Sequence, residues 1–406
     1  MRSLYRDGDF LRLWGGQTIS EVGSRISREG LPLVAVLILG ASPTEVGLIA
    51  AAGSVAVLTG GLVAGVWVDR LPRRPILVGA DLGRALVLAS VPLAAIGGAL
   101  ALPQLYLVAF ATAFLGAFFD VAYGAYLPSL VGIERVVEGN AKLAQSSAIA
   151  EIAGPSLGGT LVSLVTAPLA IAFDALSFVV SAVSIGSIRR TEMASPPAVL
   201  RPGLLAEARA GLEIVWRDPS LRALAGAGTL RRFAGAFYSS LYVIYAIRKI
   251  GTGPALLGII ISLGGVGALI GGTLAAPATG RFGIGRTVAI GFLLSALVAF
   301  LSPFASAVPL ALGVLFLAVP QLLGDAASTV GLVGAASLRQ RLAPPGTLGR
   351  VTATNHVLQE GVGPLGAVVG GVLAERIGIP AALFLSALGA LVAALWLARS
   401  PLRRIR

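Results

Sequence analysis

The stretch GGLVAGVWVDRLPRRP, residues 60–75, decides the fold of this chain. An apolar run ends inside it, one acid and three arginines follow within a very short turn, and a second apolar run begins at Ile76. Burying unpaired charges in hydrocarbon is costly, so these four charges must lie in water or in a polar cluster at a membrane edge. Gly61 and Gly65 are one helical turn apart and should let a neighbouring helix approach closely. The stretch therefore predicts a helix–loop–helix hairpin whose loop faces the positive, cytoplasmic side.

The composition is that of a membrane protein with many spans. Of 406 residues, 56% are hydrophobic and 12% are charged, and the mean hydropathy is +0.88, so a soluble domain would have too few polar side chains to cover its surface. The absence of cysteine excludes disulfides, thiolate metal sites and cysteine nucleophiles. Asp7, Asp9 and Arg12 interrupt the start, so we expect no cleaved signal peptide and a first span that serves as its own insertion signal.

Twelve apolar stretches are long enough to cross a hydrocarbon core of about 30 Å. Most of the 31 basic residues fall between them on one side, whereas Arg248, Lys249 and Arg376 fall on the other. Basic segments stay in the cytoplasm, so both termini are expected there, and the net charge of +12 reflects topology rather than nucleic-acid binding. The expected spans are 10–39, 43–68, 75–98, 103–127, 141–165, 168–188, 220–247, 254–278, 286–305, 308–336, 350–374 and 379–398.

The chain repeats itself. A shift of 211 residues places Asp7 on Asp218 and Pro43 on Pro254, and it continues without a gap through the signature stretch, whose second copy has lost its acid. Two parallel halves of six spans each are therefore predicted.

The predicted organisation is an all-α membrane protein with three parts. Residues 1–188 form an N-terminal six-helix bundle, 189–219 a cytoplasmic linker, and 220–406 a C-terminal six-helix bundle. In the linker, apolar residues from Leu204 to Val215 recur at helical spacing between charged ones, which predicts an amphipathic helix on the cytoplasmic surface.

The charged turn also carries a family pattern, G-x-x-x-D-R-x-x-R-R, made by Gly65, Asp69, Arg70, Arg73 and Arg74. It resembles the signature loop between the second and third spans of the major facilitator superfamily, with proline at position 72 where that family usually has glycine. The resemblance implies twelve helices in two bundles that rock about a midplane site.

A second motif lies in the fifth span, where Gly154, Pro155, Gly158 and Gly159 fit G-P-x-x-G-G. This is similar to a motif of antiporters and exporters in the same superfamily. Proline removes one backbone hydrogen bond and glycines permit close packing, so the helix can bend against its neighbour. The first half also resembles a bacterial efflux branch, that of enterobactin exporters and macrolide efflux proteins, in FLRLW (10–14), FDVA (119–122), LPSLV (127–131), GNA (139–141) and DALSF (174–178).

Charges inside the membrane are the first candidates for function, because each is expensive to place there. Glu21, Arg25 and Glu29 recur every four residues on one face of the first span. They are either a self-neutralising ladder that lets the helix insert or a protonatable site in a transport cavity. The shift of 211 places Glu21 opposite Arg232 of the seventh span, and we hypothesise that the two pair across the cavity; Arg25 is the competing partner.

Further candidates lie on other spans. Tyr238, Tyr242 and Tyr245 share one helical face and offer either a stacking surface for substrate or ordinary packing. Asp325 lies well inside the tenth span and is a second candidate for proton or substrate contact. The fifth and eleventh spans both contain E-x-x-G-P, with Glu151 and Glu360 as the acids; His356 precedes Glu360 by one turn and is either a proton relay or structural.

The resemblance also implies a conformational clamp. Asp120, near the cytoplasmic end of the fourth span, should hold Arg73, while Asp69 should lie against the start of the eleventh span. Asp81 and Arg84 are expected to belong to the same polar cluster, and Asp174 to be a packing residue.

The expected function is proton-driven export of a hydrophobic or amphipathic small molecule, such as a drug or siderophore, across the bacterial inner membrane. The alternatives are an uncoupled translocator of a metabolite or lysolipid, and a protein that keeps the fold without transporting. We expect a monomer with no cofactor, no metal and no enzymatic activity, because no nucleophile or metal constellation is present.

Overall fold

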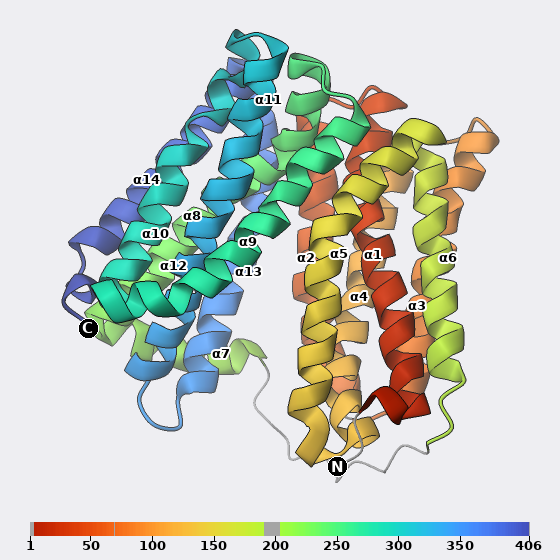
Figure 1. The fold of residues 1–406 in the computed structure, drawn as a ribbon, viewed down its shortest axis with the longest axis horizontal. Coiled ribbons are helices and arrows are strands. Elements are labelled where there is room, and N and C mark those ends of the chain that lie inside the picture. Colours follow the sequence, from red (N-terminus) through yellow and green to blue (C-terminus); the bar gives the residue numbers. More distant parts are fainter. Residues whose placement is uncertain (1–3, 69, 191–203, 406) are drawn as a thin grey trace. The chain divides into compact units, whose positions relative to one another are not determined.

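A computed structural model describes residues 4–68, 70–190 and 204–405, and this part of the chain is helical, with no strand. Asp69 and most of the first half of the linker lie outside the described residues. The helices are α1 (Gly8–Leu37), α2 (Pro43–Trp67), α3 (Arg73–Ile96), α4 (Leu102–Val131), α5 (Val136–Leu164), α6 (Ala167–Gly186), α7 (Leu204–Arg217), α8 (Pro219–Ile244), α9 (Pro254–Phe282), α10 (Ile284–Ala299), α11 (Leu310–Val319), α12 (Asp325–Leu342), α13 (Leu348–Ile377) and α14 (Ile379–Arg399) (Figure 1).

Nine segments of the described chain are long and apolar enough to cross a membrane. A π-helical turn, Pro320–Gly324, joins α11 to α12, so that these form one such segment, Leu310–Leu342. Helices α1, α5 and α8 have 30, 29 and 26 residues, long enough to span, but each carries at least three charged side chains. The remaining three of the twelve expected spans, and the side on which the termini lie, stay predictions.

The chain divides into two compact units. The N-terminal unit comprises Met1–Ala41 and Ala52–Arg201, and the C-terminal unit comprises Ser42–Ala51 and Pro202–Arg406. In the first, α1 packs against α5 and α6, and α3 against α4 and α6. In the second, α8 packs against α13 and α14, and α10 against α12 and α14. The two units therefore use the same packing scheme on equivalent helices.

The structure carries the sequence repeat in its helix boundaries. Helices α1, α2 and α3 begin at residues 8, 43 and 73, and α8, α9 and α10 begin 211 residues later, at 219, 254 and 284. Asp7 and Asp218 are the N-caps of α1 and α8: Asp7 accepts a hydrogen bond from Phe10 N–H, and Asp218 accepts two from the first turn of its helix. An N-cap carboxylate satisfies backbone donors that the helix leaves unpaired. The repeat therefore sets where equivalent helices start.

The first turns of α2 belong by contact to the C-terminal unit. A Cβ on Gly47 would lie 2.5 Å from the carbonyl oxygen of Ala367, and one on Gly371 would lie 2.7 Å from that of Pro43. Glu375 accepts a hydrogen bond from Thr44 N–H at 3.1 Å. The sequence boundary at 188/189 placed the whole of α2 in the first half, because that boundary followed chain order and these contacts join residues about 320 positions apart.

The predicted hairpin is present, with α2 ending at Trp67 and α3 beginning at Arg73. The close approach predicted at Gly61 occurs one residue earlier, at Gly60. Among the described residues, nothing lies within 4 Å of a Cβ built on Gly61 or Gly65, whereas one on Gly60 would lie 3.0 Å from both Phe114 O and Ala117 Cβ of α4. Glycine spacing predicts that helices can approach, but the direction of each glycine is set by how the helix is rotated.

The linker contains the predicted helix, α7, which packs on α13 (Figure 1). A Cβ on Gly211 would lie 2.2 Å from Arg350 O, so the two backbones touch there. Thr354 donates a hydrogen bond to Ala208 O at 2.7 Å, and Val215 is buried. The linker helix is thereby fixed to the start of α13.

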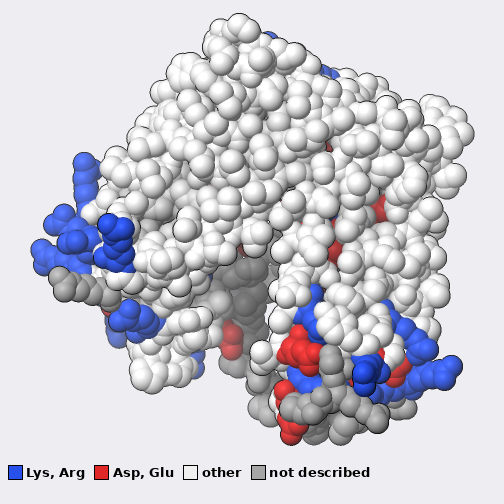
Figure 2. Space-filling model, viewed as in Figure 1, with Lys and Arg blue, Asp and Glu red and all other residues white. Residues whose placement is uncertain are grey.

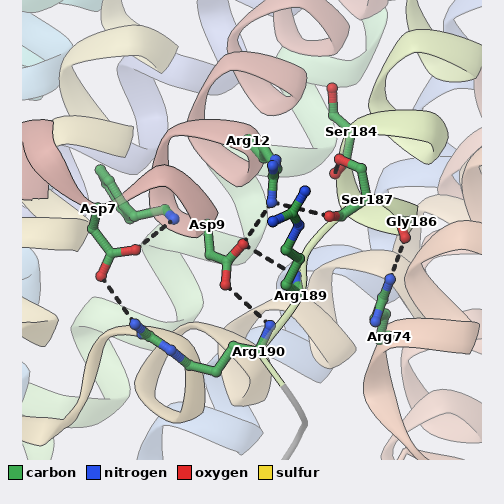
Figure 3. Close-up of polar contacts among 10 residues, drawn as sticks. Asp7, Asp9, Arg12, Arg74, Ser184, Gly186, Ser187, Arg189 and Arg190 are labelled. Atoms are coloured by element: carbon green, nitrogen blue, oxygen red, sulfur yellow. Dashed lines mark hydrogen bonds and ion pairs between the residues drawn. The ribbon is translucent and has the colours of Figure 1, made fainter.

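Charged side chains gather at one end of each unit on the face that Figure 2 shows. At this end of the N-terminal unit, Asp9 accepts hydrogen bonds from the backbone N–H groups of Arg189 and Arg190 and pairs with Arg12 at 2.8 Å (Figure 3). Arg12 also donates to Ser187 O, and Arg190 donates to Leu130 O. This network ties the start of α1 to the ends of α4 and α6.

Asp9 precedes the expected first span, and its charge is stabilised. Burial raises the pKa of its carboxyl, but the two backbone N–H groups and the Arg12 guanidinium outweigh burial and hold that pKa below the ordinary value. Since the folded-state pKa is depressed, Asp9 contributes stability above the unfolded-state pKa and loses it as the pH falls through the folded-state pKa.

Replacing Asp9 by Asn should therefore lower the free energy of unfolding at neutral pH by about 1 kcal/mol. The difference from the unmodified protein should shrink as the pH is lowered below the ordinary range of an aspartate. Thermal unfolding in detergent between pH 3 and pH 7 measures both effects. Glu134→Gln, an exposed acid at the same end of the unit, is the matched control. A deficit that stays constant down to pH 3 would contradict the proposed role of the charge.

Candidate functional site

Arg25 of α1 is the centre of a charged cluster in the N-terminal unit. It forms an ion pair with Glu151 of α5 and lies 3.6 Å from Glu21, one turn earlier on its own helix. Arg28 lies 4.0 Å from the other oxygen of Glu151. Glu29 is a third acid of the cluster, after Glu21 and Glu151, and interacts electrostatically with Arg25 and Arg28. Glu21 therefore has the competing partner, Arg25, that the sequence offered for it.

The G-P-x-x-G-G motif is what lets α5 approach this cluster. A Cβ on Gly154 would lie 2.4 Å from Arg25 Cβ, and one on Gly158 would lie 3.1 Å from Ile26 Cα. Pro155 and Gly159 are buried in the same stretch, and α5 continues through Pro155 without a break. Only a residue without a side chain fits at position 154, so the motif places Glu151 within reach of the guanidinium.

The C-terminal unit contains a second pair of the same kind. Arg232 Nη2 of α8 lies 2.8 Å from Glu360 Oε2 of α13, and a Cβ on Gly363 would lie 3.6 Å from that guanidinium. Glu360 and Gly363 belong to the second E-x-x-G-P motif, as Glu151 and Gly154 belong to the first. In each unit, the acid of this motif pairs with an arginine, on α1 in the N-terminal unit and on α8 in the C-terminal unit.

Both motifs are evident in the sequence, but their shared role is not. The two arginines are not related by the shift of 211 residues, which pairs Arg232 with Glu21. The hypothesis of a Glu21–Arg232 pair was based on the need of each charge for a partner. Each has such a partner within its own unit, Arg25 for Glu21 and Glu360 for Arg232. The sequence feature that could have revealed this shared role is the recurrence of E-x-x-G-P in two spans, each with an arginine-bearing helix in the same half of the chain.

A polar cavity of about 300 Å³ lies between α1, α4 and α5 of the N-terminal unit. Two carboxylates, Glu21 and Asp120, line it together with neutral polar groups, and aromatic rings form part of the wall. The neutral and aromatic lining includes Gln17, Thr18, Phe119, Tyr123, Asn140, Ser146 and Ser147. Asp120 lines this cavity together with Glu21, and the charged groups that act on it are Arg84 and Glu21. The clamp between Asp120 and Arg73 stays a prediction.

A smaller cavity of about 180 Å³ lies inside the C-terminal unit, where the π-helical turn Pro320–Gly324 meets α8 and α10. Asp325, Gln321, Arg231 and Tyr238 line it. A Cβ on Gly264 of α9 would lie 2.5 Å from Asp325 Oδ2, so the glycine makes room for the acid. A π-helical turn changes the rotation of a helix locally and is frequent at functional sites.

The three tyrosines of the predicted aromatic face have different environments. Tyr238 lines the cavity just described. Tyr245 is fully buried, and its hydroxyl donates to Pro303 O and accepts from Ser306 N–H, both at 3.0 Å. Tyr242 is also buried, and its ring packs 5.0 Å from that of Tyr238. Tyr245 is thus held by packing and backbone hydrogen bonds, and Tyr238 lines a cavity.

His356 is exposed, and the acid one turn later, Glu360, contacts Arg232. The relay role and the structural role of the histidine both stay predictions. No group of three or more residues that could hold a metal ion occurs in the part of the chain that the structure describes.

In the signature loop, Arg74 donates to Gly186 O at the end of α6, where a cation is favoured by the helix dipole (Figure 3). Arg70 is exposed. The roles of Gly65 and Arg73 stay predictions, and Asp69 lies outside the described residues.

Asp81, Arg84 and Asp174 are buried in the interior of the N-terminal unit. Asp81 pairs with Arg84, whose guanidinium lies over the rings of Phe119 and Phe178 at 4.6 and 4.1 Å. Asp174 accepts a hydrogen bond from Ser177 at 3.1 Å. These contacts describe a buried polar cluster that binds α3, α4 and α6 together.

A double-mutant cycle tests which acid holds Arg25. Arg25→Gln and Glu151→Gln, alone and combined, should show a coupling free energy of about 1 kcal/mol, because Arg25 is largely buried while Glu151 is partly exposed. The cycle of Arg25→Gln with Glu21→Gln is the matched comparison and should give the smaller value, since that distance is longer. Thermal unfolding in detergent supplies the free energies. A larger coupling for Glu21 would reverse the assignment.

The packing role of Gly154 is tested by Gly154→Ala. The added methyl group should overlap Arg25 and lower the free energy of unfolding by about 1–3 kcal/mol. Gly124→Ala on α4 is the control, since nothing described lies within 4 Å of its Cβ position and alanine favours a helix. Equal stability of both variants in a thermal unfolding assay would exclude close packing at position 154.

Known proteins share this chain's sequence and fold along almost its full length. A family model described as transmembrane secretion effector matches residues 3–406. The multidrug efflux pump Tap of Mycolicibacterium fortuitum is 30% identical over 374 residues, covering 87% of each protein. Macrolide efflux protein A of Streptococcus pyogenes is 24% identical over 371 residues, covering 91% of this chain and 90% of that protein.

A solved structure agrees in fold. A bacterial homologue of the iron transporter ferroportin, in an inward-facing state, gives a TM-score of 0.80 at 18% identity and covers 98% of this chain and 99% of its own. The resemblance to the major facilitator superfamily and its efflux proteins is thus confirmed. The chain belongs to the transmembrane secretion effector family of the major facilitator superfamily, and it is a multi-pass membrane transporter.

Proposed function

We propose that this protein exports a hydrophobic or amphipathic small molecule in exchange for protons, as a secondary active transporter of the bacterial inner membrane with both termini in the cytoplasm. The observation that carries the proposal is the polar cavity of the N-terminal unit, in which Glu21 and Asp120 face a space of about 300 Å³. Acids on helices of a transporter are expensive to keep and mark ion or substrate pathways. The names of the relatives, a multidrug pump and a macrolide efflux protein, agree with export.

The cavity suits a positive charge. It presents two carboxylates and several hydroxyl and amide groups, while its phenylalanine and tyrosine offer faces for an apolar or cationic body. A proton and the amine of an amphipathic substrate would compete for the same acid, Glu21. Their binding would then be mutually exclusive, which is the requirement for exchange.

The charged cluster next to the cavity allows Glu21 to be protonated without leaving Arg25 unpaired. Arg25 has two carboxylate partners, Glu151 and Glu21. When a proton neutralises Glu21, Arg25 keeps its ion pair with Glu151, so protonation leaves no buried cation without a partner. Asp325, with Gln321 and Tyr238 around the smaller cavity, is the second proton candidate. Motion of the two units by alternating access would expose the site to each side in turn.

Transport assays distinguish proton exchange from uncoupled movement. Reconstituted vesicles with an imposed pH gradient should concentrate an amphipathic cation such as ethidium, and addition of that cation should move protons across the membrane. Glu21→Gln should abolish uphill transport but leave downhill exchange of substrate, because the rest of the cavity survives. Asp325→Asn tests the second candidate in the same way, and Glu134→Gln is the control.

Each rival predicts a different result in these vesicles. An uncoupled metabolite or lysolipid translocator would move substrate without moving protons. A protein that kept the fold without transporting would show neither flux nor protection of a cavity label by substrate. If both Glu21→Gln and Asp325→Asn still concentrate substrate, neither acid carries the proton, and Glu360 becomes the next candidate.

A further inference from the structure

A second concave surface lies on the C-terminal unit, away from the cavity that holds Asp325. Helices α9, α10 and α12 border an open groove of about 590 Å³. Its floor is made by small residues: a Cβ on Gly291 of α10 would lie 2.7 Å from Ala327 O of α12, so the two helices touch there. Large apolar side chains form the walls.

These walls expose a continuous set of large apolar side chains. Leu274, Leu294 and Leu323 line the groove, and about half of each side chain is accessible. In a membrane transporter such a surface faces lipid rather than water. The groove therefore opens toward the bilayer.

The groove carries its charge at one end. Arg281, in the last turn of α9, is its one charged lining residue among those described. Arg286 follows at the start of α10, and the turn Pro401–Arg404 lies directly on that start, where Gly285 N–H donates to Ile405 O at 3.2 Å. Segments 277–298 and 399–405 contain no acidic residue. Figure 2 shows basic side chains gathered at this end of the unit.

The length of the groove matches one leaflet. Thr287, beside the arginine end, and Val298, at the far end, both line it, and α10 rises about 16 Å between them. Half of a hydrocarbon core of about 30 Å has almost the same length. A molecule with a negative group at Arg281 and an acyl chain along Leu294 would fill the groove from the head-group level to the midplane.

We propose that this groove binds an anionic phospholipid from the leaflet on the Arg281 side, with its phosphate at Arg281 and one acyl chain between α9, α10 and α12. Basic pockets between membrane helices favour anionic head groups because each cation near the membrane surface attracts them. The apolar walls fix the chain by dispersion contacts and add no selectivity for the head group. This site does not depend on what the protein exports.

Native mass spectrometry of the full-length protein with defined lipids tests the proposal. Phosphatidylglycerol should be retained in preference to phosphatidylethanolamine and phosphatidylcholine. Arg281→Gln should weaken that retention about fivefold, the effect expected for one cation near a membrane surface. Arg376→Gln, an exposed arginine at the end of α13, removes the same charge elsewhere and should leave retention unchanged.

A second pair of variants probes the acyl chain. Leu294→Trp places a large ring in the groove and should reduce retention, whereas Leu269→Trp, an equally exposed position on α9 that does not line the groove, should not. Equal retention of the three lipids, an unchanged Arg281→Gln, or equal effects of the two Trp variants would each overturn the assignment. Thermal unfolding without added lipid confirms that every variant is folded.

Discussion

The packing of helices within each unit depends on an ion pair between an arginine of α1 or α8 and the glutamate of an E-x-x-G-P motif. A lone guanidinium in hydrocarbon costs at least about 2.5 kcal/mol on insertion scales. Arg25 and Arg232 are therefore tolerable only where another helix brings a carboxylate to them, as α5 and α13 do. Gly154, three residues after Glu151, leaves the room that α1 needs beside α5, and on α13 the tight approach to α8 is at Gly366, where a Cβ would lie 2.4 Å from Phe233 O. The neutralisation of each arginine therefore requires that the two helices pack closely.

Both units contain this ion pair, but they differ in the charges that surround their cavities. In the N-terminal unit, Arg25 faces two acids and stands beside a cavity with two carboxylates. In the C-terminal unit, the cavity is smaller and holds Asp325 with Arg231, whose guanidinium lies 4.8 Å from the centre of the Phe292 ring. An acid close to a cation is easier to keep ionised than one without such a neighbour. The proton site is therefore proposed at the cavity of the N-terminal unit, whose lining, among the described residues, has two acids and no basic residue.

The ends of the helices are held by different means from their middles. Asp7 and Asp218 cap α1 and α8, and Asp9 and Arg74 tie the ends of the N-terminal unit together (Figure 3). In the C-terminal unit, the linker helix α7 fixes the start of α13, and the final turn covers the start of α10. These networks lie where water is available, so their charges need less compensation than Arg25 does.

The sequence by itself determined the helical class, the hairpin at residues 60–75, the amphipathic linker helix and the repeat with its helix starts. Each follows from local hydrophobicity, capping residues or spacing along one chain segment. Only the tertiary structure decided that Arg232 contacts Glu360, that Asp120 turns to the cavity with Glu21, and that Gly60 rather than Gly61 meets α4. These depend on how each helix is rotated against a neighbour that is distant in sequence. A rotation of one residue, about 100°, exchanges a cavity position for a packed one, and hydrophobic periodicity is too weak in a helix that is apolar on every side to fix that rotation.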